Sequence, residues 1–228
     1  MTAQESFRAM LRDSVGPTLR GAGFTGTAPT WCLRSGRGDV AVVNLARSRW
    51  NTADEVRFDV NLALVPQPWW QFSTRFLLDK APKTPGFHDG LFDKQCHPER
   101  RHAGWLHPVL GRDGWVVRDA ASADVCVDVL REELTTVVIP ELVALQQRET
   151  LIATLRAEAQ DWRVAVWHGL PRKVAITMPM LDEGPSPEIA EAINIVRSLP
   201  ADRIKARDAL LDLLITNSPP SVRPGNTR

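Results

Sequence analysis

The chain has 228 residues, of which 43% are hydrophobic and 24% are charged, values that are typical of a folded globular protein and exclude an intrinsically disordered one. Its 28 basic and 27 acidic residues give a net charge of +1, so no overall field attracts nucleic acid or an anionic membrane. No apolar run reaches the roughly 18 residues of a membrane-spanning helix, and the N-terminus lacks the pattern of a secretory signal. We therefore expect a cytoplasmic protein that binds neither nucleic acid nor a membrane.

The first predicted element is an amphipathic helix over residues 3–20, in which Phe7 and Leu11 lie on one apolar stripe. Gly16-Pro17 is expected to kink it, because proline lacks a backbone N–H and its ring clashes with the preceding turn.

Three strands are predicted next, because β-branched and aromatic residues alternate with polar ones between turn residues. They cover residues 30–35, 39–48 and 55–65. A two-residue loop between the first two strands would put Trp31 on the wrong face. A three-residue loop at 36–38 pairs Trp31 with Val43 and Leu33 with Ala41, so we favour it.

The second hairpin is predicted from a symmetric connection through residues 49–54. This connection pairs Leu45 with Phe58 and Val43 with Val60, and it places Asn44 opposite Asp59. The apolar and polar faces of the two strands then agree.

The remaining chain is expected to be mostly helical. Residues 68–78 predict a short helix with Trp69, Phe72 and Phe76 inward, and the Pro-, Gly- and His-rich stretch 81–104 is expected to be a loop. A fourth strand at about 115–118 precedes a long helix over 121–147, which Pro140 should bend. Further helices are expected over 149–216, one of them starting at Ser186-Pro187, and a frayed tail over 217–228.

Together these elements predict an α+β fold. Its sheet is an antiparallel four-stranded meander with helices packed on one face, because the strand connections are too short for parallel crossovers. We expect an α+β domain over residues 1–148, a helical extension over 149–216 packed on it, and a disordered tail over 217–228. The predicted core consists of Phe7, Leu11, Trp31, Leu33, Val43, Leu45, Phe58, Val60, Leu62, Val129 and Leu134.

Familiar catalytic and cofactor motifs are incomplete in this sequence. Gly21-Ala-Gly23-Phe-Thr-Gly26 matches G-x-G-x-x-G, but it ends a predicted helix and enters a strand, the reverse of a dinucleotide site. The three cysteines are scattered, which is typical of free thiols in a reducing cytosol. We predict no cofactor and no metal site, with His97 and His102 as the weak candidates for metal ligands.

The order of several short motifs resembles a known family. Leu19-Arg-Gly-Ala-Gly-Phe24 is followed by Val42-Val-Asn-Leu-Ala-Arg-Ser48, Phe58-Asp-Val-Asn-Leu-Ala63, His97-Pro-Glu-Arg-Arg101 and Asp113-Gly-Trp-Val-Val117. Over roughly residues 5–147 this series resembles the bacterial domain-of-unknown-function family 4304. The family usually has an aromatic pair after that aspartate, whereas this chain has Trp115-Val116. The resemblance implies a fold and no particular reaction.

The candidate binding residues gather around the second predicted hairpin. The polar face of the sheet carries Asn44, Arg57, Asp59 and Asn61, the loop adds Arg47, Arg49 and Trp50, and the next segment adds Trp69 and Trp70. If these loops fold over one end of the sheet, guanidinium and indole groups line a cleft for a planar or anionic group.

Two functions follow as hypotheses. The first is a non-enzymatic, immunity-type or regulatory module that binds another protein or a small anionic ligand, because tryptophan and arginine are enriched at binding hot spots. The alternative is an enzyme that acts on a small polar or anionic substrate through an Arg- and His-lined pocket.

Overall fold

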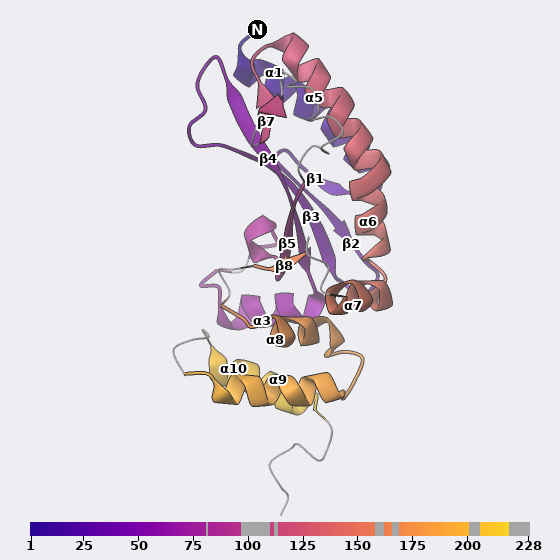
Figure 1. The fold of residues 1–228 in the computed structure, drawn as a ribbon, viewed down its shortest axis with the longest axis vertical. Coiled ribbons are helices and arrows are strands. Elements are labelled where there is room, and N and C mark those ends of the chain that lie inside the picture. The colour runs from indigo at the N-terminus through magenta and orange to yellow at the C-terminus, as the bar shows by residue number, and fades with distance from the viewer. Residues whose placement is uncertain are drawn as a thin grey trace, which may run out of the picture.

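The computed structural model describes residues 1–80, 82–96, 110–111, 114–157, 162–165, 169–200 and 206–218. Within these residues an antiparallel sheet of eight strands has the order β1-β2-β3-β4-β5-β8, with β7 beside β4 and β6 beside β7 (Figure 1). The strands are β1 (Thr25–Thr27), β2 (Thr30–Arg34), β3 (Val40–Arg47), β4 (Val56–Val65), β5 (Phe92–Cys96), β6 (Leu110–Gly111), β7 (Gly114–Val117) and β8 (Arg163–Val164). The predicted α+β class and antiparallel order are confirmed.

The predicted count of four strands is too low, and β5 is the main omission. It lies inside the stretch 81–104 that was expected to be a loop, and it pairs with β4 in the middle of the sheet. Two charged residues, Asp93 and Lys94, interrupt its apolar pattern. Each forms an ion pair: Asp93 with Arg163, and Lys94 with Glu141 at 3.0 Å. A sequence pattern cannot show such distant partners.

The predicted register of the first hairpin is confirmed, because Trp31 pairs with Val43 and Leu33 with Ala41. The register of the second hairpin is wrong by two residues: Val43 pairs with Leu62 instead of Val60. A shift of two residues leaves every side chain on the same face, so the hydrophobic pattern cannot distinguish the two registers.

The loop of the second hairpin fixes its register. The Asn51 side chain donates to the Arg57 carbonyl at 2.9 Å and accepts from the Arg57 backbone N–H at 2.8 Å. The Ser48 backbone N–H also donates to that carbonyl at 2.9 Å. These bonds hold Ser48 opposite Arg57, and every pair in β3 and β4 follows from that.

The helices cover one face of the sheet and one of its ends (Figure 1). They are α1 (Ala3–Met10), η1 (Leu11–Val15), α2 (Gly16–Gly21), α3 (Gln67–Phe76), η2 (Phe87–Asp89), α5 (Ala120–Glu133), η3 (Leu134–Val138), α6 (Ile139–Ala144), α7 (Arg148–Arg156), α8 (Arg172–Thr177), η5 (Met178–Met180), α9 (Pro187–Ser198) and α10 (Arg207–Thr216). The Ser186 hydroxyl caps α9 by accepting from Ile189, as its sequence predicts. No helix among the described residues is long and apolar enough to cross a membrane.

Both prolines that were expected to bend helices directly follow a π-helical turn. In η1 the Gly16 N–H bonds to the Leu11 carbonyl, and in η3 the Ile139 N–H bonds to the Leu134 carbonyl. Each turn therefore contains one residue more than an α-helical turn. This widening accommodates the proline ring that would otherwise clash with a carbonyl four residues earlier.

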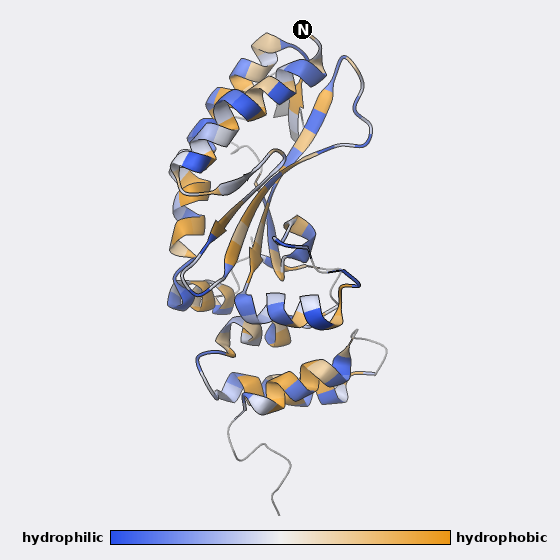
Figure 2. Cartoon of the chain, turned by 180° about the vertical axis from the view of Figure 1, so that it is seen from behind, coloured by the Kyte–Doolittle hydropathy of each residue, from blue (hydrophilic) through white to orange (hydrophobic). Residues whose placement is uncertain are grey.

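The two faces of the sheet differ in what covers them. The helix face, which includes Val43 and Phe58, packs on α1, α5 and α6. The open face carries the alternating residues of the same strands, and hydrophilic and hydrophobic residues alternate along β4 (Figure 2). At its lower end Cys32 contacts the Pro85 carbonyl, and Gly90 lies close to Ala63.

The predicted core is confirmed except at two positions. Leu33 and Val129 are half-buried at the edge of the core, while the other nine predicted residues are buried. In α5 the buried stripe runs through Cys126 and Leu130, so the buried position is one residue beyond the predicted Val129.

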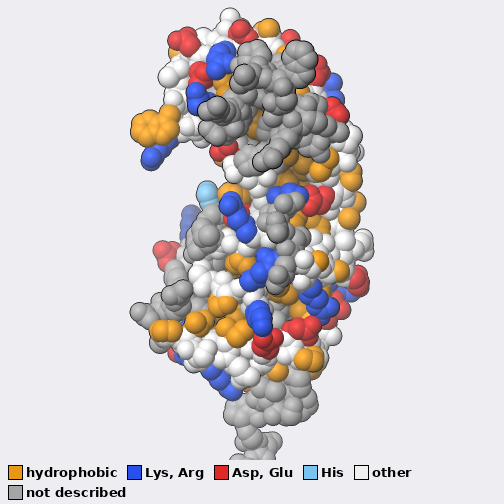
Figure 3. Space-filling view, viewed as in Figure 1, with side chains coloured by type: hydrophobic (Ala, Val, Ile, Leu, Met, Phe, Trp, Pro, Cys, Tyr) orange, Lys and Arg blue, Asp and Glu red, His pale blue; other side chains and the backbone are white. Residues whose placement is uncertain are grey.

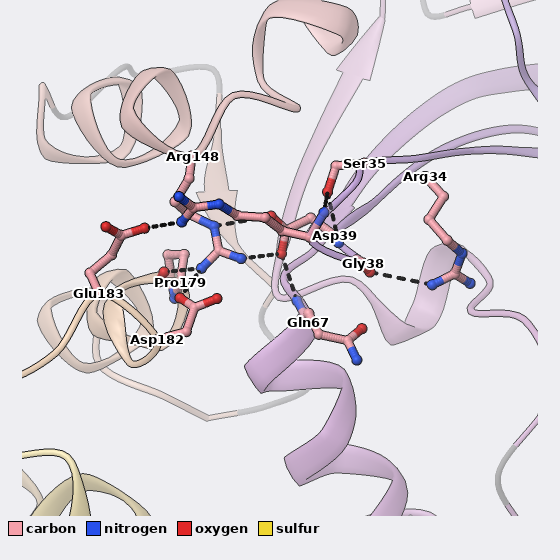
Figure 4. A network of polar contacts seen from close by, with 10 residues as sticks. Arg34, Ser35, Gly38, Asp39, Gln67, Arg148, Pro179, Asp182 and Glu183 are labelled. Atoms are coloured by element: carbon pink, nitrogen blue, oxygen red, sulfur yellow. Dashed lines mark hydrogen bonds and ion pairs between the residues drawn. The ribbon is translucent and has the colours of Figure 1, made fainter.

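A buried arginine joins the C-terminal helices to the sheet (Figure 4). Arg148 in α7 forms a two-pronged ion pair with Asp39 of the β2–β3 hairpin, at 2.7 and 3.0 Å, and also contacts Asp182 at 2.5 Å and the Pro179 carbonyl. Asp39 accepts in addition the backbone N–H of Gln67, the first residue of α3. One hydrophobic core extends from α1 to α10.

The division of the chain into a domain over 1–148 and a helical extension over 149–216 remains our proposal. Of the predicted tail, Asn217 and Ser218 close α10, with Ser218 fully buried. Residues 219–228 lie outside the described part of the chain.

Candidate functional site

A row of polar side chains crosses the open face of the sheet. Thr30, Asn44, Asn61 and Gln95 stand directly opposite one another on β2, β3, β4 and β5. All four are half-buried, and opposed side chains of adjacent strands lie within contact distance. We call these four residues the polar row.

The polar row retains free hydrogen-bonding capacity. The Asn44 amide donates to the Thr30 hydroxyl at 2.8 Å. The carboxamides of Asn61 and Gln95 have no hydrogen-bond partner among the described residues. A carboxamide both donates and accepts, so these two groups match a ligand that offers the same pair of functions, such as a peptide backbone.

The open face becomes more enclosed along β4. Arg57 is exposed, Asp59 and Asn61 are half-buried, and Ala63 is buried. The surface is hollowed at this side of the sheet, between the β3–β4 hairpin and the segments below it (Figure 3). The polar row therefore lies where the exposed hairpin end of the face meets its covered end.

The hairpin tip, which we define as residues Arg49, Trp50 and Asn51, projects beside this hollow. Trp50 is 77% exposed, and the Arg49 guanidinium carbon lies 4.8 Å from the centre of its ring. The bonds from Asn51 to Arg57 and from the Trp50 N–H to the Ser48 hydroxyl order the turn. The exposed indole is thus held on a defined loop.

Ion pairs engage the base of the hairpin. Glu55 lies 2.6 Å from Arg57 and 2.9 Å from Arg118. The hydrogen bond from Arg57 is the main cause that holds the pKa of Glu55 below its ordinary value, and Arg118 adds to it. Arg57 is therefore occupied by an internal partner, although its side chain is exposed.

The structure brings together only part of the predicted site. Asn44, Asp59 and Asn61 share the open face, with Arg57 and Trp50 toward its hairpin end. Arg47 is on the helix face instead, because it is an even number of residues from Val43, and it donates to Gln4 of α1 at 3.0 Å.

Trp69 and Trp70 lie on α3, away from the polar row. Trp69 is 1% exposed, and its indole N–H donates to the Asp89 carbonyl at 3.0 Å. Trp70 is half-buried against the core. Prolines at residues 66 and 68 start this helix at the far end of β4 from the hairpin tip.

Sequence reasoning missed Thr30 and Gln95. Thr30 was assigned to the first predicted strand, and the predicted register already places it opposite Asn44, but it was not counted among the residues of the polar face. Gln95 was assigned to a loop. Phe92 and Cys96 at alternate positions are a partial signal for its strand, and the charged Lys94 between them breaks the apolar pattern.

The described residues contain no group of three or more His, Cys, Asp or Glu side chains arranged to hold a metal. The weak metal candidates His97 and His102 lie outside the described residues. Cys32, Cys96 and Cys126 are free and buried. Burial raises the pKa of Cys96 and Cys126 to about 12, and it also raises the pKa of Cys32.

These thiols should be nearly inert in the folded protein. We expect Ellman's reagent at pH 8 to react at least about a hundredfold more slowly with the native protein than with the protein in urea, because the thiolate is the reacting form.

The raised thiol pKa values also make the stability of the folded protein depend on pH. Above the ordinary thiol pKa of 9.0 the unfolded chain loses protons that the folded chain keeps, so the free energy of unfolding should fall between about pH 9 and 12. Rapid reaction of one cysteine in the native state would contradict this.

The comparisons with known proteins add one match. The family model for a domain of unknown function (DUF4304) matches residues 15–145. This range is more than half of the chain and includes the hairpin tip and the polar row. No match was found to a curated protein or to a solved structure. The chain belongs to the DUF4304 family.

Proposed function

We propose that this protein is a binding module for another protein, with the hairpin tip and the polar row as its contact surface. The observation that supports the proposal most is the exposure of Trp50. Trp31, Trp69, Trp115 and Trp162 are each 1% exposed and Trp70 is half-buried, whereas Trp50 is 77% exposed. A large indole on an ordered turn exposes apolar area that a partner can cover at little entropic cost.

The chemistry around Trp50 fits a protein partner. Arg49 stacks on the indole and leaves the N–H groups at the edge of its guanidinium available for a carboxylate or carbonyl. The free carboxamides of the polar row suit the backbone of an extended segment. The alternative of an enzyme with an Arg- and His-lined pocket uses an acid or base from the region of His97, and His97 lies outside the described residues.

Substitutions at the hairpin tip test the proposal. Trp50→Ala and Arg49→Ala should change the free energy of unfolding by less than about 1 kcal/mol, since both side chains project from the surface. Each should weaken binding of a partner captured by the wild-type protein by about tenfold or more, as hot-spot residues do. The partner is captured from cells that express the protein, purified, and titrated by calorimetry.

Two control variants define the outcome. Arg47→Ala removes a nearby cation on the helix face, and Val143→Ala trims a residue of α6 that is 46% exposed. Both should bind the partner like wild type. If Trp50→Ala retains every protein that Val143→Ala retains, with equal affinity, the hairpin tip is not the contact surface.

A further inference from the structure

A pocket of about 300 Å³ is lined by residues of α3, of α10 and of the segment that follows η5. These elements lie at the opposite end of the molecule from the β3–β4 hairpin (Figure 1). Phe72, Arg75 and Phe76 of α3 form one wall, and Leu181, Asp182 and Leu213 contribute the other side. This volume is at the lower end of the range for small-molecule sites, which runs from about 300 to 1,000 Å³. It accommodates a small ligand only.

The apolar wall of the pocket is incompletely covered. Helical spacing places Phe76 on the same side of α3 as Trp69 and Phe72, which are 1% and 3% exposed. Phe76 nevertheless remains 40% exposed, with its ring 5.4 Å from that of Phe72. The two rings, tilted against each other, and the side chain of Leu213 thus present apolar surface that a ligand can remove from water.

Arg75 supplies an available positive charge at this wall. Its guanidinium carbon lies 5.0 Å from the centre of the Phe76 ring, and it forms no ion pair with any described residue. A guanidinium that stacks on a ring keeps the N–H groups at its edge free, in the geometry that matches a carboxylate.

Asp182, the acidic group among the described residues that line the pocket, shares a buried arginine with Asp39. Asp182 accepts from Arg148 at 2.5 Å, and Arg148 is 1% exposed. Glu183, the next residue, pairs with Arg37. The Arg148 guanidinium thus serves two carboxylates, and Arg75 is the cation of the pocket wall that has no ion-pair partner among the described residues.

We propose that this pocket binds a small amphipathic carboxylate, whose apolar body packs on Phe72, Phe76 and Leu213 and whose carboxylate accepts from Arg75. The site is separate from the hairpin tip and does not depend on the proposed protein-binding function. The protein would therefore bind a second class of ligand, at a surface that stays accessible when a protein partner covers the open face.

Three probes with the same eight-carbon body test the proposal: octanoate, octan-1-ol and octylamine. Titrations of the full chain are followed by calorimetry and by backbone amide NMR shifts. Octanoate should bind at least about tenfold more tightly than octan-1-ol, because it adds a charge-assisted hydrogen bond. Octylamine should bind no better than octan-1-ol, and the octanoate shifts should map to α3 and α10.

Variants of the pocket complete the test. Arg75→Gln should lower octanoate affinity about tenfold and leave octan-1-ol unchanged, while Leu213→Trp should fill the pocket and weaken both. The matched control is Arg131→Gln, an arginine of α5 whose side chain is 53% exposed, and it should bind octanoate like wild type. Trp50→Ala should also bind normally. Octanoate shifts outside the pocket, or equal octanoate affinity in Arg75→Gln and Arg131→Gln, would overturn the assignment.

Discussion

Replacement of Arg148 by methionine should lower the free energy of unfolding by about 3–5 kcal/mol, the usual range when one partner of a buried ion pair is removed. The guanidinium is 1% exposed and the Asp39 carboxylate 5% exposed. Methionine has a similar volume but cannot donate, so the Asp39 carboxylate would remain buried with the Gln67 N–H as its remaining hydrogen-bond donor among the described residues. The Pro179 carbonyl would also lose its donor.

A second arginine of α7 provides the control. Arg156 pairs with Glu188 at the surface, where the two side chains are 51% and 39% exposed. Arg156→Met should cost less than about 1 kcal/mol, because exposed ion pairs contribute little. Urea unfolding followed by tryptophan fluorescence measures both variants. If the two unfold at the same urea concentration, the Arg148 network does not hold the C-terminal helices to the sheet.

The sequence predicted those parts of the fold that depend on local alternation and turn chemistry. The first hairpin is correct in register because a three-residue loop is the one that keeps Trp31 and Leu33 on the face of Val43. The second hairpin has a longer loop, and its register depends on side-chain hydrogen bonds from Asn51 that no hydrophobic pattern contains.

Long-range pairs account for what the sequence did not predict. Strand β5 places Asp93 and Lys94 inside the sheet because Arg163 and Glu141, far along the chain, neutralise them. The Asp39–Arg148 pair likewise joins two residues more than 100 positions apart. At the site, parity along each strand correctly grouped Asn44, Asp59 and Asn61 on one face. Gln95, which stands opposite Asn61, could not be added to this group because β5 was not predicted as a strand.

Replacement of Phe58 by alanine should lower the free energy of unfolding by about 3–5 kcal/mol, the range for a fully buried aromatic residue. Phe58 is 2% exposed, and its ring lies 5.0 Å from that of Phe7 in α1 and 5.9 Å from that of Trp115 in β7. Alanine would leave a cavity between these two elements, and the ring contacts on both sides would be lost. Phe76→Ala is the control, because a side chain that is 40% exposed should cost less than about 1 kcal/mol when trimmed. Thermal and urea unfolding measure both variants, and a Phe58→Ala protein as stable as Phe76→Ala would show that the packing of α1 on β4 contributes little to the stability of the sheet.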